Sequence, residues 1–224
     1  MALDAILDVI HEINNPLNGI IGMAEVALEQ GASTRKEFLT DILSCAQRIN
    51  HIIREFKSCT HTSRSLVDVN EVLERSLSMV QKMIAPRPSV KVIKRLHHLR
   101  KIAVNVPEIQ EVFTNLITNA LQAMNGKKGV LTLSTRLQKD WIEIKVSDNG
   151  VGISKQNLNR IFERFFTTKN NGEGMGLGLN IVQRIVGAYG GTIGVQSSKS
   201  LGTTFTVKFP VGGTNEAEKS IGCG

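Results

Sequence analysis

The chain has 224 residues, of which 41% are hydrophobic and 21% are charged, and its formal net charge is +7 at pH 7. This composition excludes a disordered polypeptide, and no apolar run approaches the roughly 20 residues that a membrane-spanning helix needs. Lys and Arg are scattered along the chain, so the charge favours a solvated basic surface over a nucleic acid site and also suits a polyphosphate ligand.

Two amphipathic helices are predicted in the first sixty residues. Apolar residues recur at steps of three and four from Leu3 to Leu28, and again from Phe38 to Phe56. Two long helices joined by a short loop form an antiparallel hairpin, to which we assign residues 1–61. A hairpin alone encloses no core, so its apolar stripes favour dimerisation into a four-helix bundle. Packing of the hairpin on the rest of its own chain is the alternative.

The first helix contains the stretch HEINNP, in which Pro16 lacks the N–H of a helix interior and is expected to bend the helix. His11 and Asn15 are four residues apart and therefore share a face. A neutral imidazole is a competent nucleophile, and the adjacent carboxylate of Glu12 can orient it or accept its proton. A lone His on a helix is more often a solvated side chain, but this combination makes His11 a candidate nucleophile.

Residues 62–212 have a mixed pattern that predicts a second domain. Several strands arrive in hairpins and not in strict strand–helix–strand alternation, which favours an α+β fold: a two-layer sandwich with a mixed sheet and all helices on one face. Residues 213–224 are low in apolar content and are predicted to form a disordered tail. Strands are expected at 65–69, 90–96, 101–104, 129–136, 141–148, 193–196 and 203–209. Helices are expected at 177–189, after Asn70, which can cap a helix, and after Asn105, which caps a helix with Glu108 at the capping-box position.

Asn115 and Asn119 stand on one face of the helix that follows Asn105, opposite Phe113 and Ile117. Asn is a poor helix former, so a pair on one face calls for an explanation. Two exposed polar residues are one interpretation. The other is a pair of carboxamide oxygens that face a cation or a phosphate.

A base-recognition site is predicted at the end of the strand 141–148. Asp148 closes this strand, and Gly150 and Gly152 allow the backbone to turn sharply after it. A carboxylate at the base of an otherwise apolar pocket accepts the exocyclic amine of adenine, whereas guanine presents a carbonyl there.

A glycine run precedes the helix at 177–189. Gly174, Gly176 and Gly178 let backbone N–H groups approach phosphates, and a helix N-terminus favours negative charge. Such a run is weak evidence by itself, and it lacks the ending of a P-loop. Its occurrence together with Asp148 and the two asparagines strengthens its interpretation as a phosphate-binding segment.

Six motifs, HEINNP, NLITNALQAM, DNGVG, IFERFFTTK, GMGLGL and GTTF, occur in this order along residues 1–210. They resemble the H box, N box, first glycine box, F box, second glycine box and Gly-Thr box in the transmitter core of two-component sensor histidine kinases. The resemblance implies that the FTTK segment belongs to a lid over the nucleotide, which Phe162, Phe165 and Phe166 would anchor. This lid and the NALQA helix look most like the nitrogen-regulator-type subgroup. The resemblance implies a dimeric histidine-phosphotransfer hairpin followed by a gyrase-like ATP-binding domain.

By this resemblance, His11 is autophosphorylated from Mg-ATP and passes the phosphoryl group to an Asp of a response-regulator receiver domain. Glu12 would be its acid–base partner, and Asn15 would position a water for dephosphorylation of the regulator. The implied nucleotide residues are Asn119 on Mg²⁺ with Asn115 in support, Asp148 on adenine with Gly150 and Gly152 shaping the pocket, Lys169, Gly174, Gly176, Gly178 and Leu179 near the phosphates, and Thr203 or Thr204 near the adenine.

The sequence departs from the family pattern at Gln122, where many relatives carry a basic residue; phosphate charge would then fall to Lys169 or Arg164. Cys45, Cys59 and Cys223 form no CxxC pair, which favours reduced thiols and a cytoplasmic location, as the cytosolic part of a longer sensor. We expect no nucleic acid partner and no membrane contact from this segment. A nucleotide-binding pseudokinase scaffold and a gyrase-like ATPase acting on nucleic acid are the alternatives, and the His-box hairpin counts against the second.

Overall fold

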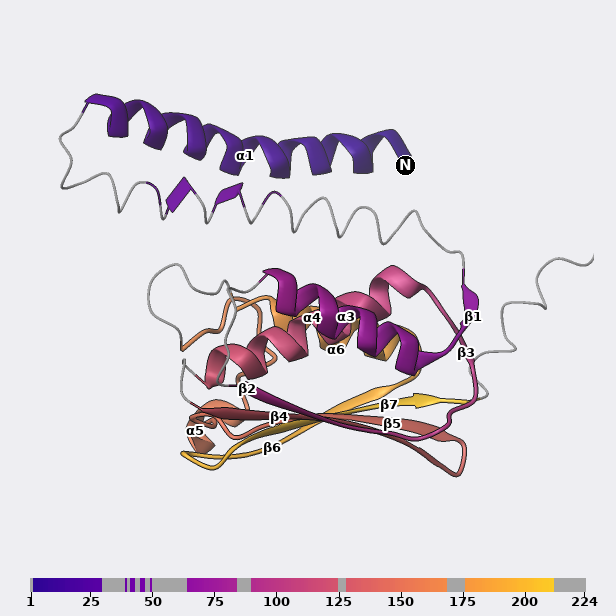
Figure 1. Cartoon of the computed structure of the whole chain (residues 1–224). Helices are drawn as coiled ribbons and strands as arrows, with labels where there is room; N and C mark the ends of the chain where they lie inside the picture. Colours follow the sequence, from indigo (N-terminus) through magenta and orange to yellow (C-terminus); the bar gives the residue numbers. More distant parts are fainter. Residues whose placement is uncertain are drawn as a thin grey trace, which may run out of the picture. The chain divides into compact units, whose positions relative to one another are not determined.

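The computed structural model describes residues 2–29, 39, 41–42, 45–46, 49, 64–83, 90–124, 128–168 and 176–211. The chain divides into two compact units, the first centred on residues 1–62 and the second on residues 63–166 and 176–224. Figure 1 traces both units along the sequence. The tail predicted at 213–224 lies outside the described residues.

The first unit is built on helix α1, which runs from Ala2 to Glu29 without interruption at Pro16. It confirms the first predicted helix. The described residues between 39 and 49 are also helical, and a Cβ built on Gly19 would lie 3.5 Å from Sγ of Cys45. The two helical segments therefore pack against each other, as a hairpin requires. Most of the second predicted helix lies outside the described residues.

Five strands of the second unit form a sheet in the order β2-β4-β5-β7-β6. β2 and β4 are parallel and the other neighbouring pairs are antiparallel, which confirms the predicted mixed sheet. A separate antiparallel pair is formed by β1 (Ser65–Val67) and β3 (Ile102–Val104). The sheet strands span Val90–Leu96 (β2), Gly129–Gln138 (β4), Trp141–Asp148 (β5), Thr192–Ser198 (β6) and Gly202–Pro210 (β7).

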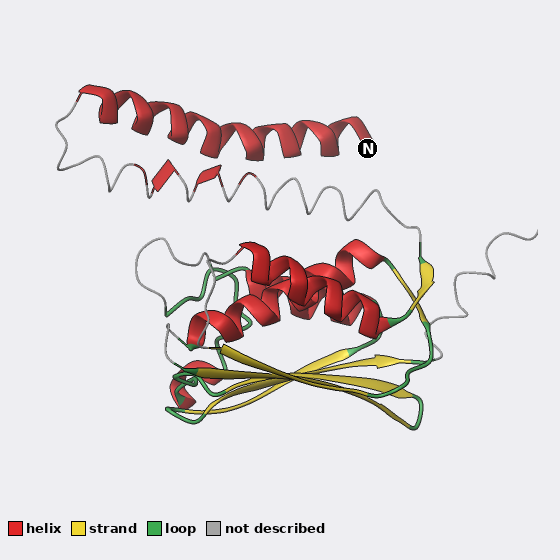
Figure 2. Cartoon of the chain, in the orientation of Figure 1, coloured by secondary structure: helices red, strands yellow, loops and turns green. Residues whose placement is uncertain are grey.

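Three helices cover one face of this sheet: α3 (Val69–Met83), α4 (Val106–Ala123) and α6 (Gly178–Ala188). Figure 2 shows them as one layer against the strands, which confirms the two-layer α+β architecture. The core lies between the layers, where Phe113 of α4 and Ile144 of β5 are almost fully buried. Burying each large apolar side chain contributes about 1.5–3 kcal/mol before chain entropy is subtracted.

The local signals at the helix starts were partly right. Asn105 caps α4 as predicted, because its side-chain oxygen accepts the N–H of Glu108 at 3.2 Å. The expected cap at Asn70 is wrong: α3 already begins at Val69, and the carboxylate of Asp68 accepts the N–H of Asn70 at 2.9 Å. Two polar residues that are two positions apart can each cap a helix, and the earlier one does so here.

Two further details differ from the sequence-based expectations. The connection between β4 and β5 is shorter than the four residues expected, because Gln138 pairs with Trp141 and only two residues turn the chain. Lys139 in this turn has a positive φ of 55°, as a tight hairpin demands. The short helix α5 (Lys155–Leu158) was not expected from the sequence.

The N-terminal end of α4 and the C-terminal end of α6 are joined by Tyr189. Its hydroxyl accepts the backbone N–H of Asn105 at 2.9 Å and donates to the carboxylate of Glu108. The guanidinium of Arg64 lies 4.9 Å from the centroid of the Tyr189 ring, within cation–π range. The segment that leads into β1 is thereby attached to both helices.

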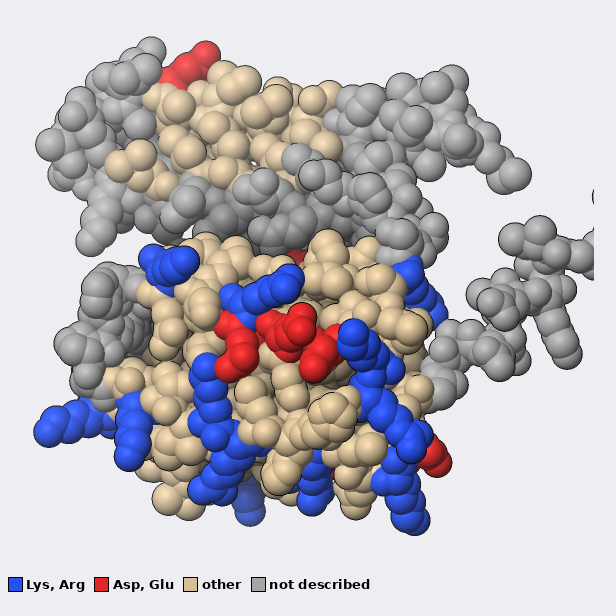
Figure 3. All heavy atoms as spheres, turned by 45° about the vertical axis from the view of Figure 1, so that its right-hand side comes forward, with Lys and Arg blue, Asp and Glu red and all other residues tan. Residues whose placement is uncertain are grey.

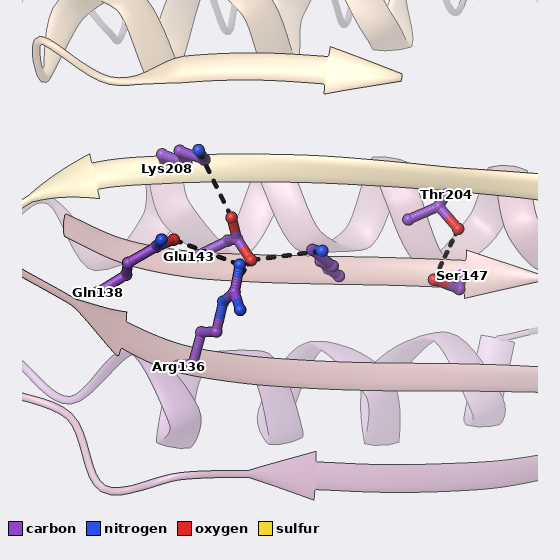
Figure 4. A network of polar contacts seen from close by, with 7 residues as sticks. Arg136, Gln138, Glu143, Ser147, Thr204 and Lys208 are labelled. Atoms are coloured by element: carbon purple, nitrogen blue, oxygen red, sulfur yellow. Dashed lines mark hydrogen bonds and ion pairs between the residues drawn. The ribbon is translucent and has the colours of Figure 1, made fainter. Parts of the chain in front are cut away.

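The opposite face of the sheet is polar and carries one buried carboxylate, on Glu143 of β5, whose side chain is 5% exposed. It contacts Arg136 at 2.7 Å, Lys145 at 3.4 Å and Lys208 at 3.5 Å (Figure 4). Burial alone would raise the pKa of Glu143, but Arg136 and Lys145 hold that pKa below its usual value. The network ties β4, β5 and β7 together from outside the core.

Charges of both signs alternate elsewhere on the second unit. Figure 3 shows Lys and Arg side chains spread over one face with acidic side chains between them. Ion pairs such as Lys94–Glu74 at 2.7 Å and Arg75–Glu71 at 3.7 Å belong to this mixture. On this face the basic residues form a solvated surface and not a continuous basic stripe.

Candidate active site

The first element of the site is the carboxylate of Asp148, at the end of β5. Asp148 is buried, and its Oδ1 accepts the backbone N–H of Gly150 at 2.8 Å. The backbone N–H of Thr203 donates to the same carboxylate. Burial raises the pKa of Asp148, and the two N–H donors oppose this rise. The side chain is thus an oriented acceptor, held in place before any ligand arrives.

Three polar side chains form a row across neighbouring strands. Asp148 of β5 lies opposite Thr203 of β7, and Thr203 lies opposite Ser197 of β6. The hydroxyls of Ser197 and Thr203 are 2.9 Å apart. Because directly paired residues point to the same side of a sheet, all three side chains face the helix layer. Thr204 points to the other face, where its hydroxyl donates to Ser147 at 2.9 Å (Figure 4). Of the two candidate threonines, Thr203 is the one beside Asp148.

The turn after Asp148 is closely packed on both sides. The N–H of Val151 donates to the carbonyl of Ala123, the last residue of α4, at 3.1 Å. A Cβ on Gly150 would come within 2.6 Å of that same carbonyl. Gly152 has a φ of +67°, and a Cβ there would collide with the carbonyl of Ser198. The two predicted glycines therefore let the turn fit between α4 and β6.

The second element is the start of α6 beside α4. A Cβ on Gly178, the first residue of α6, would lie 2.9 Å from Oδ1 of Asn115. Leu177, the N-cap residue, makes no side-chain cap hydrogen bond, and the first turn of α6 lies beside Asn115. Asn119 is one turn further along α4 and is half-buried, as Asn115 is. The structure thus brings the two asparagines and the helix N-terminus together.

The described segment 160–166 contacts the start of α6. Asn180 donates from its side-chain amide to the carbonyl of Phe162 at 3.0 Å. Gly176 has a φ of +66°, and a Cβ there would meet the backbone of Phe166. Phe166 carries the guanidinium of Arg160 over its ring at 4.5 Å. Phe165, in contrast, is 59% exposed, so of the expected lid anchors it is the one that stays outside the packing.

Some predicted site residues fall where little can be read. Lys169 and Gly174 lie outside the described residues. His11 and Glu12 lie on α1, within a part of the helix whose side chains are not described. Asn15 is exposed, one turn after His11 on the same helix. Leu179 stands in the first turn of α6, with its backbone beside Gly178.

One of the hollows in the surface coincides with the row. It has a volume of about 340 Å³ and is lined by Asp148, Ser197 and Thr203 together with other residues of this end of the sheet, such as Gln196 and Thr204. A larger one of about 500 Å³ lies along α3, between exposed charges such as Glu74 and Arg75. The site therefore comprises the smaller hollow, the hydrogen-bonded row that lines it and the glycine contacts beside it.

Sequence reasoning missed Ser197. Its hydroxyl accepts the N–H of Ile153 at 2.8 Å and is 2.9 Å from the carbonyl of Gly202. A signal was present in the alternation of β6, because Ile193 and Val195 point inward and Ser197 takes the next inward position. A polar residue in an inward position calls for a partner.

The donor set fits a nucleotide-borne Mg²⁺. Asn115 and Asn119 offer carboxamide oxygens, and Mg²⁺ prefers oxygen ligands while keeping waters and phosphate oxygens. Among the residues that the structure describes, no group of three or more His, Cys, Asp or Glu could hold a metal alone. A metal that arrives with the phosphates needs only one or two protein oxygens.

In the described part of the chain, no helix is long and apolar enough to cross a membrane.

Comparisons with known proteins agree with the geometry. Residues 105–213 match the family model of the histidine kinase-, DNA gyrase B-, and HSP90-like ATPases, and residues 3–58 match the His Kinase A (phospho-acceptor) domain. The sensor histidine kinase ZraS of Escherichia coli (strain K12) is 35% identical over 208 residues, which are 91% of this chain and 44% of ZraS. The chain therefore spans less than half the length of this relative.

Solved structures agree on the fold. Full-length ShkA in complex with AMPPNP has a TM-score of 0.64 at 24% identity, over 92% of this chain and 45% of that one. The histidine kinase ThkA in complex with the response regulator protein TrrA has a TM-score of 0.62 at 21% identity, over 92% of this chain and 61% of that one. Placement in the nitrogen-regulator-type subgroup stays a prediction. With both domain models matched in the expected order, the chain belongs to the sensor histidine kinases and corresponds to their transmitter core.

Proposed function

We propose that this chain is an ATP-dependent protein-histidine kinase, which phosphorylates itself on His11 and passes the phosphoryl group to an aspartate of a response-regulator receiver domain. The observation that carries the proposal is the fixed carboxylate of Asp148, joined through α4 to the helix N-terminus at Gly178. This arrangement suits a ligand with an amine-bearing base at one end and phosphates at the other. Such a ligand is ATP.

In this proposal the ATP-binding unit positions the nucleotide. Asp148 accepts the adenine amine, and Thr203 lies beside it. The backbone N–H groups around Gly176, Gly178 and Leu179 face the phosphates, where Lys169 and Gly174 add to the same subsite. Bound Mg²⁺, held by Asn119 with Asn115 in support, would neutralise charge on the phosphate oxygens. Phosphoryl transfer depends chiefly on such positioning and charge neutralisation.

The chemical step belongs to α1. A neutral imidazole nitrogen of His11 attacks the γ-phosphorus, the bond from that phosphorus to the bridging oxygen of ADP breaks, and the carboxylate of Glu12 takes the imidazole proton. Asn15, exposed one turn later, would hold a water for hydrolysis of the phosphorylated regulator. His11 must reach the γ-phosphate, so the two units must move relative to each other during the cycle.

The partners in this proposal are a second copy of the chain and a receiver domain. The hairpin 1–61 would dimerise into a four-helix bundle, because its apolar stripes are wider than one partner helix needs. Transfer to a receiver is supported by the ThkA kinase, which was solved with the response regulator protein TrrA. ATP and receiver domains are cytoplasmic, so in this proposal the chain acts in the cytoplasm. We place the boundary between the hairpin and the ATP-binding domain after residue 61, and the end of the ATP-binding domain at residue 212. We expect no contact with nucleic acid and none with a membrane.

The proposal is tested by incubating the chain with γ-labelled ATP and Mg²⁺. We expect a phosphoryl group that is labile in acid and stable in base, that is absent in His11→Gln, and that an acceptor receiver domain removes. The matched control is His51→Gln, which removes a histidine from the other predicted helix and should leave labelling intact. Labelling retained in His11→Gln would refute the assignment of the phosphoacceptor. ATP binding without any labelling would identify a nucleotide-binding scaffold instead.

A further inference from the structure

We propose that Ser197 is a specificity-positioning residue of the base site, which holds the hydroxyl of Thr203 as a hydrogen-bond acceptor. The site would then admit a purine that presents an exocyclic amine toward Asp148 and reject one that presents a carbonyl. The inference rests on the proposed function, because it requires a nucleotide base beside Asp148.

The argument begins with the surroundings of the Ser197 hydroxyl. It accepts the backbone N–H of Ile153 at 2.8 Å, and it lies 2.9 Å from the carbonyl of Gly202 and 2.9 Å from the hydroxyl of Thr203. A serine hydroxyl has one hydrogen to donate and two lone pairs to accept with. Three neighbours at these distances use its full capacity.

Only one arrangement of hydrogens satisfies all four groups. The N–H of Ile153 can only donate, and the carbonyl of Gly202 can only accept. Ser197 therefore gives its hydrogen to Gly202 and keeps a lone pair for Thr203, whose own hydrogen points at Ser197. The reverse arrangement would leave the Gly202 carbonyl without this donor in a part-buried position, which is costly.

As a result, the hydroxyl of Thr203 can no longer rotate to donate a hydrogen bond to a ligand. With its hydrogen committed to Ser197, Thr203 can offer only lone pairs to a ligand, and the neighbouring carboxylate of Asp148 also only accepts. Thr203 is 5% exposed, so a water has little room to reverse this polarity. Thr203 and Asp148 therefore present only hydrogen-bond acceptors to a bound base.

A site that presents only hydrogen-bond acceptors distinguishes purine bases by the group that each base presents to it. The amine of adenine carries two hydrogens, whereas the carbonyl of hypoxanthine or guanine at the same place is another acceptor. Meeting that carbonyl with fixed acceptors leaves polar groups unpaired, and sites of this kind reject the wrong group strongly. A Thr203 hydroxyl released from Ser197 could rotate and donate to the carbonyl, which would soften the rejection.

The test compares ADP with inosine diphosphate, which differs at this position and cannot be turned over. Dissociation constants for both are measured by calorimetry on the full chain, with Ser197→Ala, Thr203→Val and the double variant. We expect Ser197→Ala to reduce the preference for ADP about tenfold, the worth of one hydrogen bond. In the presence of Thr203→Val, the same substitution should leave the preference unchanged, since no hydroxyl remains to rotate.

The controls separate a change in the preference for ADP caused by the Thr203 hydroxyl from a general loss of packing in the base site. Ser147→Ala removes a serine hydroxyl one position from Asp148 on the opposite face of β5, and it should not change the preference. If Ser197→Ala folds poorly, Thr203→Val alone decides: the affinity for inosine diphosphate should not fall, because Thr203 was not donating to it.

Three outcomes would overturn the inference. An unchanged preference in Ser197→Ala, with ADP binding intact, would refute it and leave the proposed function standing. An equal fall in preference with and without Thr203→Val would mean a loosened site. Failure of the unaltered chain to bind ADP at all would refute the proposed nucleotide site and the inference with it.

Discussion

Replacing Tyr189 by Phe keeps the ring and removes one hydroxyl, so it measures the connection between α4 and α6 directly. The hydroxyl accepts the N–H of Asn105 and donates to Glu108. The ring would still meet Phe209 edge to face at 6.2 Å and lie under Arg64 at 4.9 Å. The substitution therefore tests the hydrogen bonds apart from the packing.

The magnitude follows from what each partner loses. Asn105 is buried, so its N–H is left unsatisfied, at a cost of about 1–3 kcal/mol. Glu108 is half-buried and can recover its hydrogen bond from water. We expect Tyr189→Phe to lower the free energy of unfolding by about 1–3 kcal/mol, or several degrees in melting temperature.

The same hydroxyl gives a pH signature. Burial first, and the neighbouring Glu108 second, raise the pKa of Tyr189 from 10.0 to about 12. The folded chain thus favours the protonated phenol, so this contribution to stability is complete below pH 10 and is lost as the pH rises from about 10 to about 12. A shift of about 2 units corresponds to at most about 2.7 kcal/mol, at about 1.4 kcal/mol per unit.

The assay is unusually direct because Tyr189 is the single tyrosine of the chain. Near-ultraviolet absorbance of tyrosinate reports its ionisation alone, and urea titrations at each pH report the stability. We expect a midpoint well above 10 in the folded chain, a drop of stability in the same range, and a smaller drop in Tyr189→Phe. A midpoint near 10 in the folded state, or equal alkaline sensitivity of both chains, would refute the reasoning.

Substitutions at four other positions have effects whose signs follow from the contacts. Gly152→Ala should lower stability by about 2 kcal/mol or more and weaken ADP binding, whereas Gly187→Ala, which meets nothing within 4 Å inside α6, should raise stability by about 0.5–1 kcal/mol in the same urea titrations. Asn105→Ala should cost about 1 kcal/mol in urea, and Asn105→Ser should recover most of it; equal losses would exclude a capping role. Glu143→Gln should flatten the loss of stability in acid, because the lowered pKa of Glu143 gives a contribution that is present above the unfolded value of 4.5 and lost as the pH falls through the folded one; unchanged acid midpoints would contradict this.

Local chemistry was readable before the fold. Asn105 with Glu108 three residues on is a complete capping signal, and the structure has the cap as predicted. Asp148 followed by Gly150 and Gly152 predicted a sharp turn, and the chain turns there, with the N–H of Gly150 donating to the Asp148 carboxylate at 2.8 Å. Both depend on residues within a few positions of each other, where the sequence holds all the needed information.

Relations between distant segments were not readable. Ser197 acquires its partners only because β6 pairs with β7 and because Ile153, 44 positions away, returns to it. Tyr189 meets Asn105 across 84 positions, and nothing near either residue indicates the other. At Asp68 and Asn70 the information was local but ambiguous, since either side chain is a competent cap.

The two contacts between α4 and α6 have a mechanical consequence. One is the hydrogen bond between Asn105 and Tyr189, and the other is the close packing of Gly178 against the side chain of Asn115. Ten residues of helix separate Asn105 from Asn115, a span of about 15 Å at 1.5 Å per residue. A hydrogen bond at one end of this span and close packing at the other both oppose sliding of α4 along α6. A displacement of the chain at Arg64, which lies over the Tyr189 ring, would therefore be transmitted along the two helices to the first turn of α6.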